Sequence, residues 1–133
     1  MRPNHDERYT QTKTGLSPEY VEFNSQTFFE QQDDMSTKRS PSYILRPEAV
    51  ESMFILNKLT GDPTYREWGW EIFQAIERYC KTKFGYGSKH DVNKPNEEPE
   101  DKMESFFLAE TLKYHYLLHD PDNEIDILNK VSE

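Results

Sequence analysis

The sequence predicts an all-α fold built from helical hairpins with long loops. Residues 46–59 and 64–83 carry apolar side chains at spacings of three and four residues, the period of one helix face. The turn Thr60-Gly61-Asp62-Pro63 separates them, and a turn this short usually makes neighbouring helices antiparallel. A third periodic stretch follows at residues 102–119. The helical hairpin and this third helix define the predicted fold class.

The polar stretch before the helices predicts a loop-rich N-terminal segment at residues 1–42. It is rich in Thr, Gln, Ser and Asn and has no helical period. We therefore expect the helical part to occupy residues 43–133. A second long loop, at residues 84–100, is expected between the second and third helices.

Local signals predict the helix ends. Pro47 suits the first helical turn, acidic residues favour the same end of the helix dipole, and Gly61 suits a left-handed stop. In the third helix, Asp101 and Glu104 are spaced as a capping box, so we expect that helix to begin after Asp101 and to continue to His119.

The composition limits the kinds of molecule that the chain is expected to bind. The chain has 133 residues and a formal charge of −9, from 25 acidic and 16 basic residues, so it would repel a phosphate backbone and nucleic acid is not an expected partner. Mean hydropathy is −1.00, yet 14% of residues are aromatic, which indicates a carbohydrate-facing surface or one sector of a larger fold. No apolar run is long enough to span a membrane, and the first residues do not form a secretion signal.

Two groups of side chains are candidates for catalytic or ligand-binding residues. Glu48 and Glu51 lie one helical turn apart with Arg46 just before them, so they suit acid–base work, sugar binding or water around a metal. The helix dipole alone also explains two acidic residues at that position. Phe106 and Glu110 share a helix face and suit a sugar site, although Phe106 also fits a core and Glu110 a surface ion pair.

Other aromatic and histidine residues give weaker signals. Tyr65, Trp68 and Trp70 suit either a saccharide groove or a helix core. His115 and His119 lie four residues apart, which is a weak metal signal without a third ligand. The excess of carboxylates suits calcium, but it suits surface solubility equally well.

Three blocks occur in order along the chain. They are Leu-Arg-Pro-Glu-Ala-Val-Glu-Ser at 45–52, the segment from Leu-Thr-Gly-Asp-Pro to Trp-Gly-Trp-Glu-Ile at 59–72, and Asp-Lys-Met-Glu-Ser-Phe-Phe-Leu-Ala-Glu-Thr-Leu-Lys-Tyr at 101–114. Together with the loop Gly-Leu-Ser-Pro-Glu at 15–19, they resemble the class I α-1,2-mannosidases of glycoside hydrolase family 47.

The resemblance implies a fold and an activity. The fold would be a partial (α/α) barrel, one sector of an (α/α)7 toroid. The activity would be calcium-dependent, inverting hydrolysis of terminal α-1,2-linked mannose from high-mannose N-glycans on glycoproteins, as performed by mannosyl-oligosaccharide 1,2-α-mannosidases. The location would be the secretory pathway, in the membrane system of the endoplasmic reticulum or Golgi.

The resemblance also implies roles for site residues. Glu48 would be the catalytic base that activates water, and Arg46 would contact substrate or hold the carboxylates. Phe106 would pack beneath the terminal mannose. Glu51 and Glu110 would bind sugar hydroxyls or calcium-bound water; Glu48 too would reach Ca²⁺ through water, with no direct metal ligand expected from this chain.

Part of the family pattern has no counterpart here. The blocks that carry the catalytic acid are missing, and the chain ends before an Asn-Thr-Glu-Ala-His-Pro motif. We therefore expect a carboxyl-terminal fragment that is inactive alone, with exposed faces around Phe54, Trp68 and Phe107. The alternatives are a mannosidase-like glycan-binding protein of glycoprotein quality control or degradation, and a helical-repeat scaffold, for which no repeat is visible.

Overall fold

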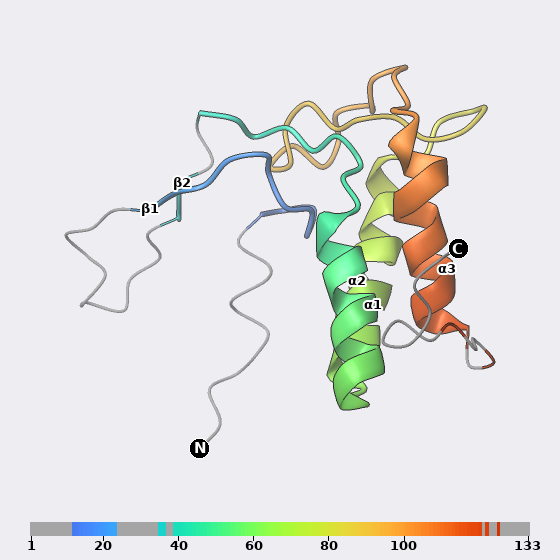
Figure 1. Cartoon of the computed structure of the whole chain (residues 1–133). Coiled ribbons are helices and arrows are strands. Elements are labelled where there is room, and N and C mark those ends of the chain that lie inside the picture. The colour runs from blue at the N-terminus through green and yellow to red at the C-terminus, as the bar shows by residue number, and fades with distance from the viewer. Residues whose placement is uncertain (1–11, 24–34, 37–38, 121, 123–124, 126–133) are drawn as a thin grey trace. The chain divides into compact units, whose positions relative to one another are not determined.

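The computed structural model describes residues 12–23, 35–36, 39–120, 122 and 125, and this part of the chain is mainly helical (Figure 1). The helical prediction is therefore confirmed. The elements are the short antiparallel pair β1 (Glu22–Phe23) and β2 (Met35–Ser36), the α-helices α1 (Glu48–Thr60), α2 (Thr64–Tyr79) and α3 (Lys113–His119), and the π-helical segment η2 (Phe107–Leu112) that leads into α3.

The chain divides into two compact units. One contains residues 1–44 and 75–103, and the other contains residues 45–74 and 104–133. The boundary expected between residues 42 and 43 stays a prediction. All five candidate site residues named above fall in the second unit.

Backbone hydrogen bonds between loops organise the described part of the first unit. Tyr43 and Lys89 exchange two N–H···O bonds of 2.8 Å, and Thr14 donates to the Val92 carbonyl through both its N–H and its hydroxyl. Lys89 is fully buried, and its ammonium donates to the Glu97 carbonyl. The long loop at residues 84–100 is thus fixed by paired polar groups, as buried backbone requires.

The core of the second unit lies between α1 and α3. Val50 and Phe54 from α1 are buried together with Leu118 from α3, and the Phe54 ring packs against Tyr114 at 5.9 Å between centroids. α2 contacts α3 at Gly69, where any added Cβ would collide with the Leu118 side chain. Gly69 therefore allows the two helices to approach closely.

Both ends of α1 follow the predicted signals. Pro47 occupies the position before the helix, and its carbonyl accepts the N–H of Glu51 at 2.9 Å. Gly61 ends the helix in the left-handed conformation, with φ of 68°, and its N–H donates to the Asn57 carbonyl. The chain then reverses into α2, as predicted for a helical hairpin (Figure 1).

The third helix ends at His119 as predicted, but the predicted end of α2 and the predicted start of the third helix were wrong. α2 ends at Tyr79 and not at residue 83, because the chain turns back there and Gly87 donates its N–H to the Cys80 carbonyl at 2.7 Å. The third helix does not begin directly after Asp101, because the π-helical segment η2 starts only at Phe107. The Lys102 carbonyl instead accepts the N–H of Ser88 at 3.1 Å, which keeps this segment extended.

The predicted exposed faces were also partly wrong. Phe54 and Phe107 are only 3% and 1% exposed. Phe54 packs between α1 and α3, which the sequence alone did not pair. Large exposed side chains lie elsewhere on the helices, including Leu59, Leu108 and Tyr116.

Candidate functional site

The site begins at a strained residue just before α1. Leu45 is buried and has a φ of 66°, a backbone conformation that residues other than glycine rarely adopt. Its carbonyl oxygen accepts the hydroxyl of Thr111, a buried residue of η2, at 2.6 Å. This bond joins the segment that carries the Arg-Pro-Glu sequence to the segment that carries Glu110.

Arg46 and Glu48 follow this anchor. One guanidinium nitrogen, Nη1, lies 3.8 Å from Glu48 Oε1, and the two side chains are 50% and 65% exposed. The Glu48 carboxylate therefore remains open to water and solutes while an arginine stands beside it. An exposed pair of this kind adds little to stability.

Glu51 and Glu110 converge on one tyrosine. The Tyr114 hydroxyl donates to Glu51 Oε1 at 2.8 Å. This hydrogen bond, then partial burial and the negative charges of Glu51 and Glu110, raise the pKa of the Tyr114 phenol above its ordinary value. Tyr114 therefore stays protonated and holds the Glu51 carboxylate in one orientation.

Phe106 and Glu110 belong to the unusual helical segment. Phe106 precedes η2 and is half-buried, and Glu110 is exposed within it. The sequence predicts an α-helix here, but residues 107–112 form a π-helix, a rare geometry that often occurs at functional sites. No short pattern in the sequence predicts this change of helix type.

The carboxylates have the chemistry of calcium ligands. Their oxygen atoms are ligands of the kind that calcium prefers. Within the described ranges, however, no group of three or more His, Cys, Asp or Glu side chains could hold a metal ion directly. The calcium contacts expected for Glu48, Glu51 and Glu110 therefore stay a prediction.

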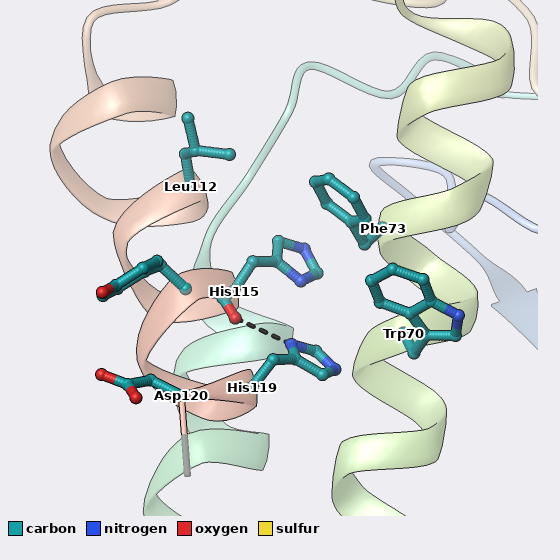
Figure 2. A pocket seen from close by; sticks show the side chains of 7 residues that line it. Trp70, Phe73, Leu112, His115, His119 and Asp120 are labelled. Atoms are coloured by element: carbon teal, nitrogen blue, oxygen red, sulfur yellow. Dashed lines mark hydrogen bonds between the residues drawn. The ribbon is translucent and has the colours of Figure 1, made fainter. Parts of the chain in front are cut away.

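A pocket lies on the other side of α3, toward α2 (Figure 2). It has a volume of about 580 Å³ and is mainly apolar. Its lining residues are Trp70, Phe73, Leu112, His115, Tyr116, His119 and Asp120. None of the candidate site residues lines it, and in the sequence only Trp70 and the histidine pair gave a weak signal for it.

A solvent-accessible carboxylate beside an arginine, with further carboxylates fixed nearby on a helical scaffold, suits acid–base hydrolysis of a hydroxyl-rich substrate, which is the chemistry of glycosidases.

The comparison with protein families then gives the family. The model of Glycosyl hydrolase family 47 matches residues 5–132, and the chain belongs to this family.

Similar proteins carry mannosidase names. The chain is 44% identical over 122 residues to the human mannosyl-oligosaccharide 1,2-alpha-mannosidase IC. This alignment covers 91% of this chain and 19% of the relative. It is 47% identical over 114 residues to the human endoplasmic reticulum mannosyl-oligosaccharide 1,2-alpha-mannosidase, covering 84% of this chain and 16% of the relative. The chain thus spans about a fifth of the length of these relatives.

A solved structure is similar as well. The alpha-1,2-mannosidase from Trichoderma reesei superimposes with a TM-score of 0.70 at 37% identity, over 83% of this chain and 25% of that one. Among the residues that the structure places, no helix has the length and apolar character that crossing a membrane requires.

Proposed function

We propose that this chain contributes part of the active site of a mannosyl-oligosaccharide 1,2-α-mannosidase, which removes terminal α-1,2-linked mannose from high-mannose N-glycans on glycoproteins. The observation that carries the proposal is the exposed Glu48 carboxylate beside Arg46, in a segment anchored through Leu45 to Thr111. Membership of glycosyl hydrolase family 47 and the mannosidase names of the relatives support it.

Glu48 acts as the catalytic base in this proposal. Its carboxylate takes a proton from water, and the oxygen of that water attacks the anomeric carbon from the face opposite the departing oxygen, which inverts the configuration. An inverting pair of carboxyl groups needs a separation of roughly 6.5–9.5 Å, which leaves room for the water. Because the chain spans about a fifth of its relatives, we assign the partner acid to a segment outside it.

The neighbouring residues position the substrate and the base. Arg46 keeps a positive charge next to Glu48 and donates to substrate oxygens. Glu51 and Glu110 accept hydrogen bonds from the sugar hydroxyls, and Tyr114 fixes the orientation of Glu51. Phe106 supplies an apolar ring for the C–H face of the mannose.

Calcium is the proposed cofactor, and Glu48, Glu51 and Glu110 would contact it through water. When bound, this ion would hold hydroxyl groups and water in a flexible oxygen coordination shell. The residues of this chain would orient those waters by accepting hydrogen bonds from them.

We also propose that the helices form one sector of an (α/α)7 barrel in the secretory pathway. The similarity to the Trichoderma reesei enzyme supports the architecture. The human relative whose name includes the endoplasmic reticulum supports the location.

A chimeric enzyme tests this function, because it supplies the segments that the chain does not span. Residues 12–120 replace the corresponding segment of the Trichoderma reesei enzyme, and hydrolysis of the methyl glycoside of α-1,2-linked mannobiose, which releases free mannose only from the non-reducing end, is followed by proton NMR. We expect calcium-dependent release of mannose that appears first as the β-anomer. A folded chimera that releases no mannose, or that releases the α-anomer first, would contradict the proposal.

A further inference from the structure

The Thr111 hydroxyl makes an unusual hydrogen bond for a threonine in a helical segment. A helical threonine or serine commonly donates to the carbonyl three or four residues earlier in its own helix. Thr60 does this in α1, where its hydroxyl donates to the Leu56 carbonyl at 2.7 Å. Thr111 instead donates to the Leu45 carbonyl, 66 residues earlier in the sequence, at 2.6 Å. Its hydroxyl therefore serves the segment before α1 and not its own helix.

Both partners of this bond are fully buried. Thr111 and Leu45 are each 0% exposed, and no other donor to the Leu45 carbonyl oxygen occurs among the residues that the structure describes. Burial keeps bulk water from replacing the Thr111 hydroxyl, and a buried carbonyl without a donor is unfavourable. A side chain of the same shape without the hydroxyl would therefore leave the Leu45 carbonyl unpaired.

The backbone between Leu45 and α1 has few torsions that can change. The ring of Pro47 restricts its own φ, here −88°, and a residue that precedes proline, such as Arg46, is restricted as well. Leu45 has a φ of 66°, which a residue other than glycine keeps only when its surroundings impose it. Leu45 is therefore the point at which the backbone leading to α1 can change direction, and the bond from Thr111 fixes that point.

The Glu48 carboxylate has little side-chain support of its own. Its side chain is 65% exposed, and Arg46 Nη1, 3.8 Å from Oε1, is the charged group paired with it in the described part of the chain. An exposed pair of this kind does not hold a side chain firmly. The position of the carboxylate therefore depends on the backbone that carries it, at the first residue of α1.

We propose that Thr111 is a positioning residue for the base: its hydroxyl holds the Leu45 carbonyl, and thereby the backbone that places the Glu48 carboxylate. This role rests on the function proposed for Glu48. It goes beyond that function, because Thr111 is buried and affects proton transfer only through the backbone. Thr111 also follows Glu110 directly, so the same bond links the base to the segment assigned to the sugar.

A bond that only stabilised the fold would have a different effect. Its loss would reduce the amount of folded protein but leave kcat of the folded protein unchanged. A positioning bond instead sets the geometry of the folded protein, and a displacement of a catalytic group by about 1 Å can lower kcat by about 100-fold. The kinetics of folded protein therefore distinguish the two roles.

The experiment measures kcat and KM of the chimeric enzyme on the methyl glycoside of α-1,2-linked mannobiose, with circular dichroism to establish the folded fraction. Thr111→Val keeps the branched shape but removes the hydroxyl, so kcat should fall about 10- to 100-fold. KM should change by less than about threefold, because the sugar contacts proposed for Phe106 and Glu110 belong to the η2 segment itself. Thr111→Ser keeps the hydroxyl and should restore kcat to within about threefold of the parent.

Thr14→Val is the matched control. Thr14 is 5% exposed, and its hydroxyl donates to the Val92 carbonyl, 78 residues away, at 2.7 Å. The variant loses a buried long-range bond of the same kind, but in the compact unit that holds none of the candidate site residues. The folded Thr14→Val chimera should keep the kcat of the parent.

A double-mutant cycle tests whether Thr111 acts through Glu48. In a Glu48→Gln background the base is already lost, so the addition of Thr111→Val should change kcat by less than about threefold. An equal fold-loss in both backgrounds would show that the bond acts on something other than the base, and would overturn the assignment.

The 133-residue chain gives a readout that does not depend on hydrolysis. In Thr111→Val, the NMR order parameters of the Arg46 and Glu48 amides should fall from about 0.85 toward 0.6, and they should stay unchanged in Thr14→Val. Unchanged order parameters in Thr111→Val, a folded Thr111→Val chimera with the kcat of the parent, or no rescue by Thr111→Ser would overturn the positioning role. Falling order parameters together with an inactive parent chimera would instead uphold the positioning by Thr111 and reject the hydrolysis proposed for Glu48.

Discussion

At the scale of single residues, the site depends on side chains that join distant parts of the chain. Thr111 bonds to the carbonyl of Leu45, and Tyr114 bonds to Glu51, in each case across more than 60 residues of sequence. The left-handed conformation of Leu45 costs about 1–2 kcal/mol, so these contacts must hold it in place. The Glu51 carboxylate and the segment that carries Glu48 are thus positioned by tertiary contacts.

Replacing Tyr114 with Phe should remove the hydrogen bond to Glu51 and lower the free energy of unfolding by about 0.5–1.5 kcal/mol, measured by urea denaturation at neutral pH. The wild-type phenol has a pKa raised above its ordinary value of 10.0, first by this bond. Because the pKa of the phenol is higher in the folded state than in the unfolded state, the protonated phenol stabilises the folded state. This stabilisation is complete below pH 10.0 and is lost as the pH rises through the pKa of the folded state.

The stability difference between wild type and Tyr114→Phe should therefore shrink in alkaline solution. Tyr116→Phe, which removes an exposed phenol from the same helix, is the matched control. A difference that stays constant across the alkaline range would contradict the role given to the Tyr114–Glu51 bond.

Replacing His115 with Phe should remove an acid-sensitive group. Burial, followed by the nearby His119, lowers its folded pKa from the ordinary 6.5 to about 4, so the unfolded chain binds the proton more readily. The wild-type free energy of unfolding should fall as the pH drops from 6.5 toward 4, by at most about 3 kcal/mol.

The His115→Phe variant should lose most of that pH slope and gain about 1 kcal/mol at neutral pH, because two unpaired buried nitrogens are removed. Thermal unfolding at several pH values measures both effects. His90→Gln, at an exposed position, should keep the wild-type slope. An equal slope in wild type and His115→Phe would refute this account of the buried ring.

At the scale of elements, local signals predicted some helix ends and failed at others. Both ends of α1 could be predicted because Pro47, the acidic first turn and Gly61 act within a few residues. The start of the third helix could not, because Lys102 pairs with Ser88, 14 residues earlier. The Arg46–Glu48 segment was found by its pattern, whereas the π-helix and the pocket arise from packing that no short pattern encodes.

Gly61→Ala tests the helix end directly. The residue has a φ of 68° and no atom within 4 Å of an added Cβ, so any cost must come from the backbone conformation alone. We expect a loss of about 1 kcal/mol in the free energy of unfolding, measured by urea denaturation.

Gly85→Ala provides the comparison, since its φ is not left-handed and the nearest atom to its added Cβ, Met103 Sδ, is at an ordinary 3.7 Å. This variant should change stability by less than about 0.5 kcal/mol. Equal losses in the two variants would show that the left-handed end of α1 is not the cause.

At the scale of the whole molecule, the chain corresponds to about a fifth of each similar mannosidase. The second unit nevertheless contains all the candidate carboxylates and the arginine, together with the pocket. The sequence could predict this membership because three separated blocks agree in order. It could not predict which contacts hold the carboxylates, since these join α1 to the η2–α3 segment.

The central claim is that Glu48 is the base, and kcat of the chimeric enzyme on α-1,2-linked mannobiose tests it most directly. Glu48→Gln keeps the size of the side chain but cannot take a proton from water, so kcat should fall by about 10²–10⁴-fold. Glu71→Gln, at an exposed position on α2, should leave kcat unchanged. A Glu48→Gln chimera that retains kcat within about threefold of the parent would contradict the assignment of Glu48.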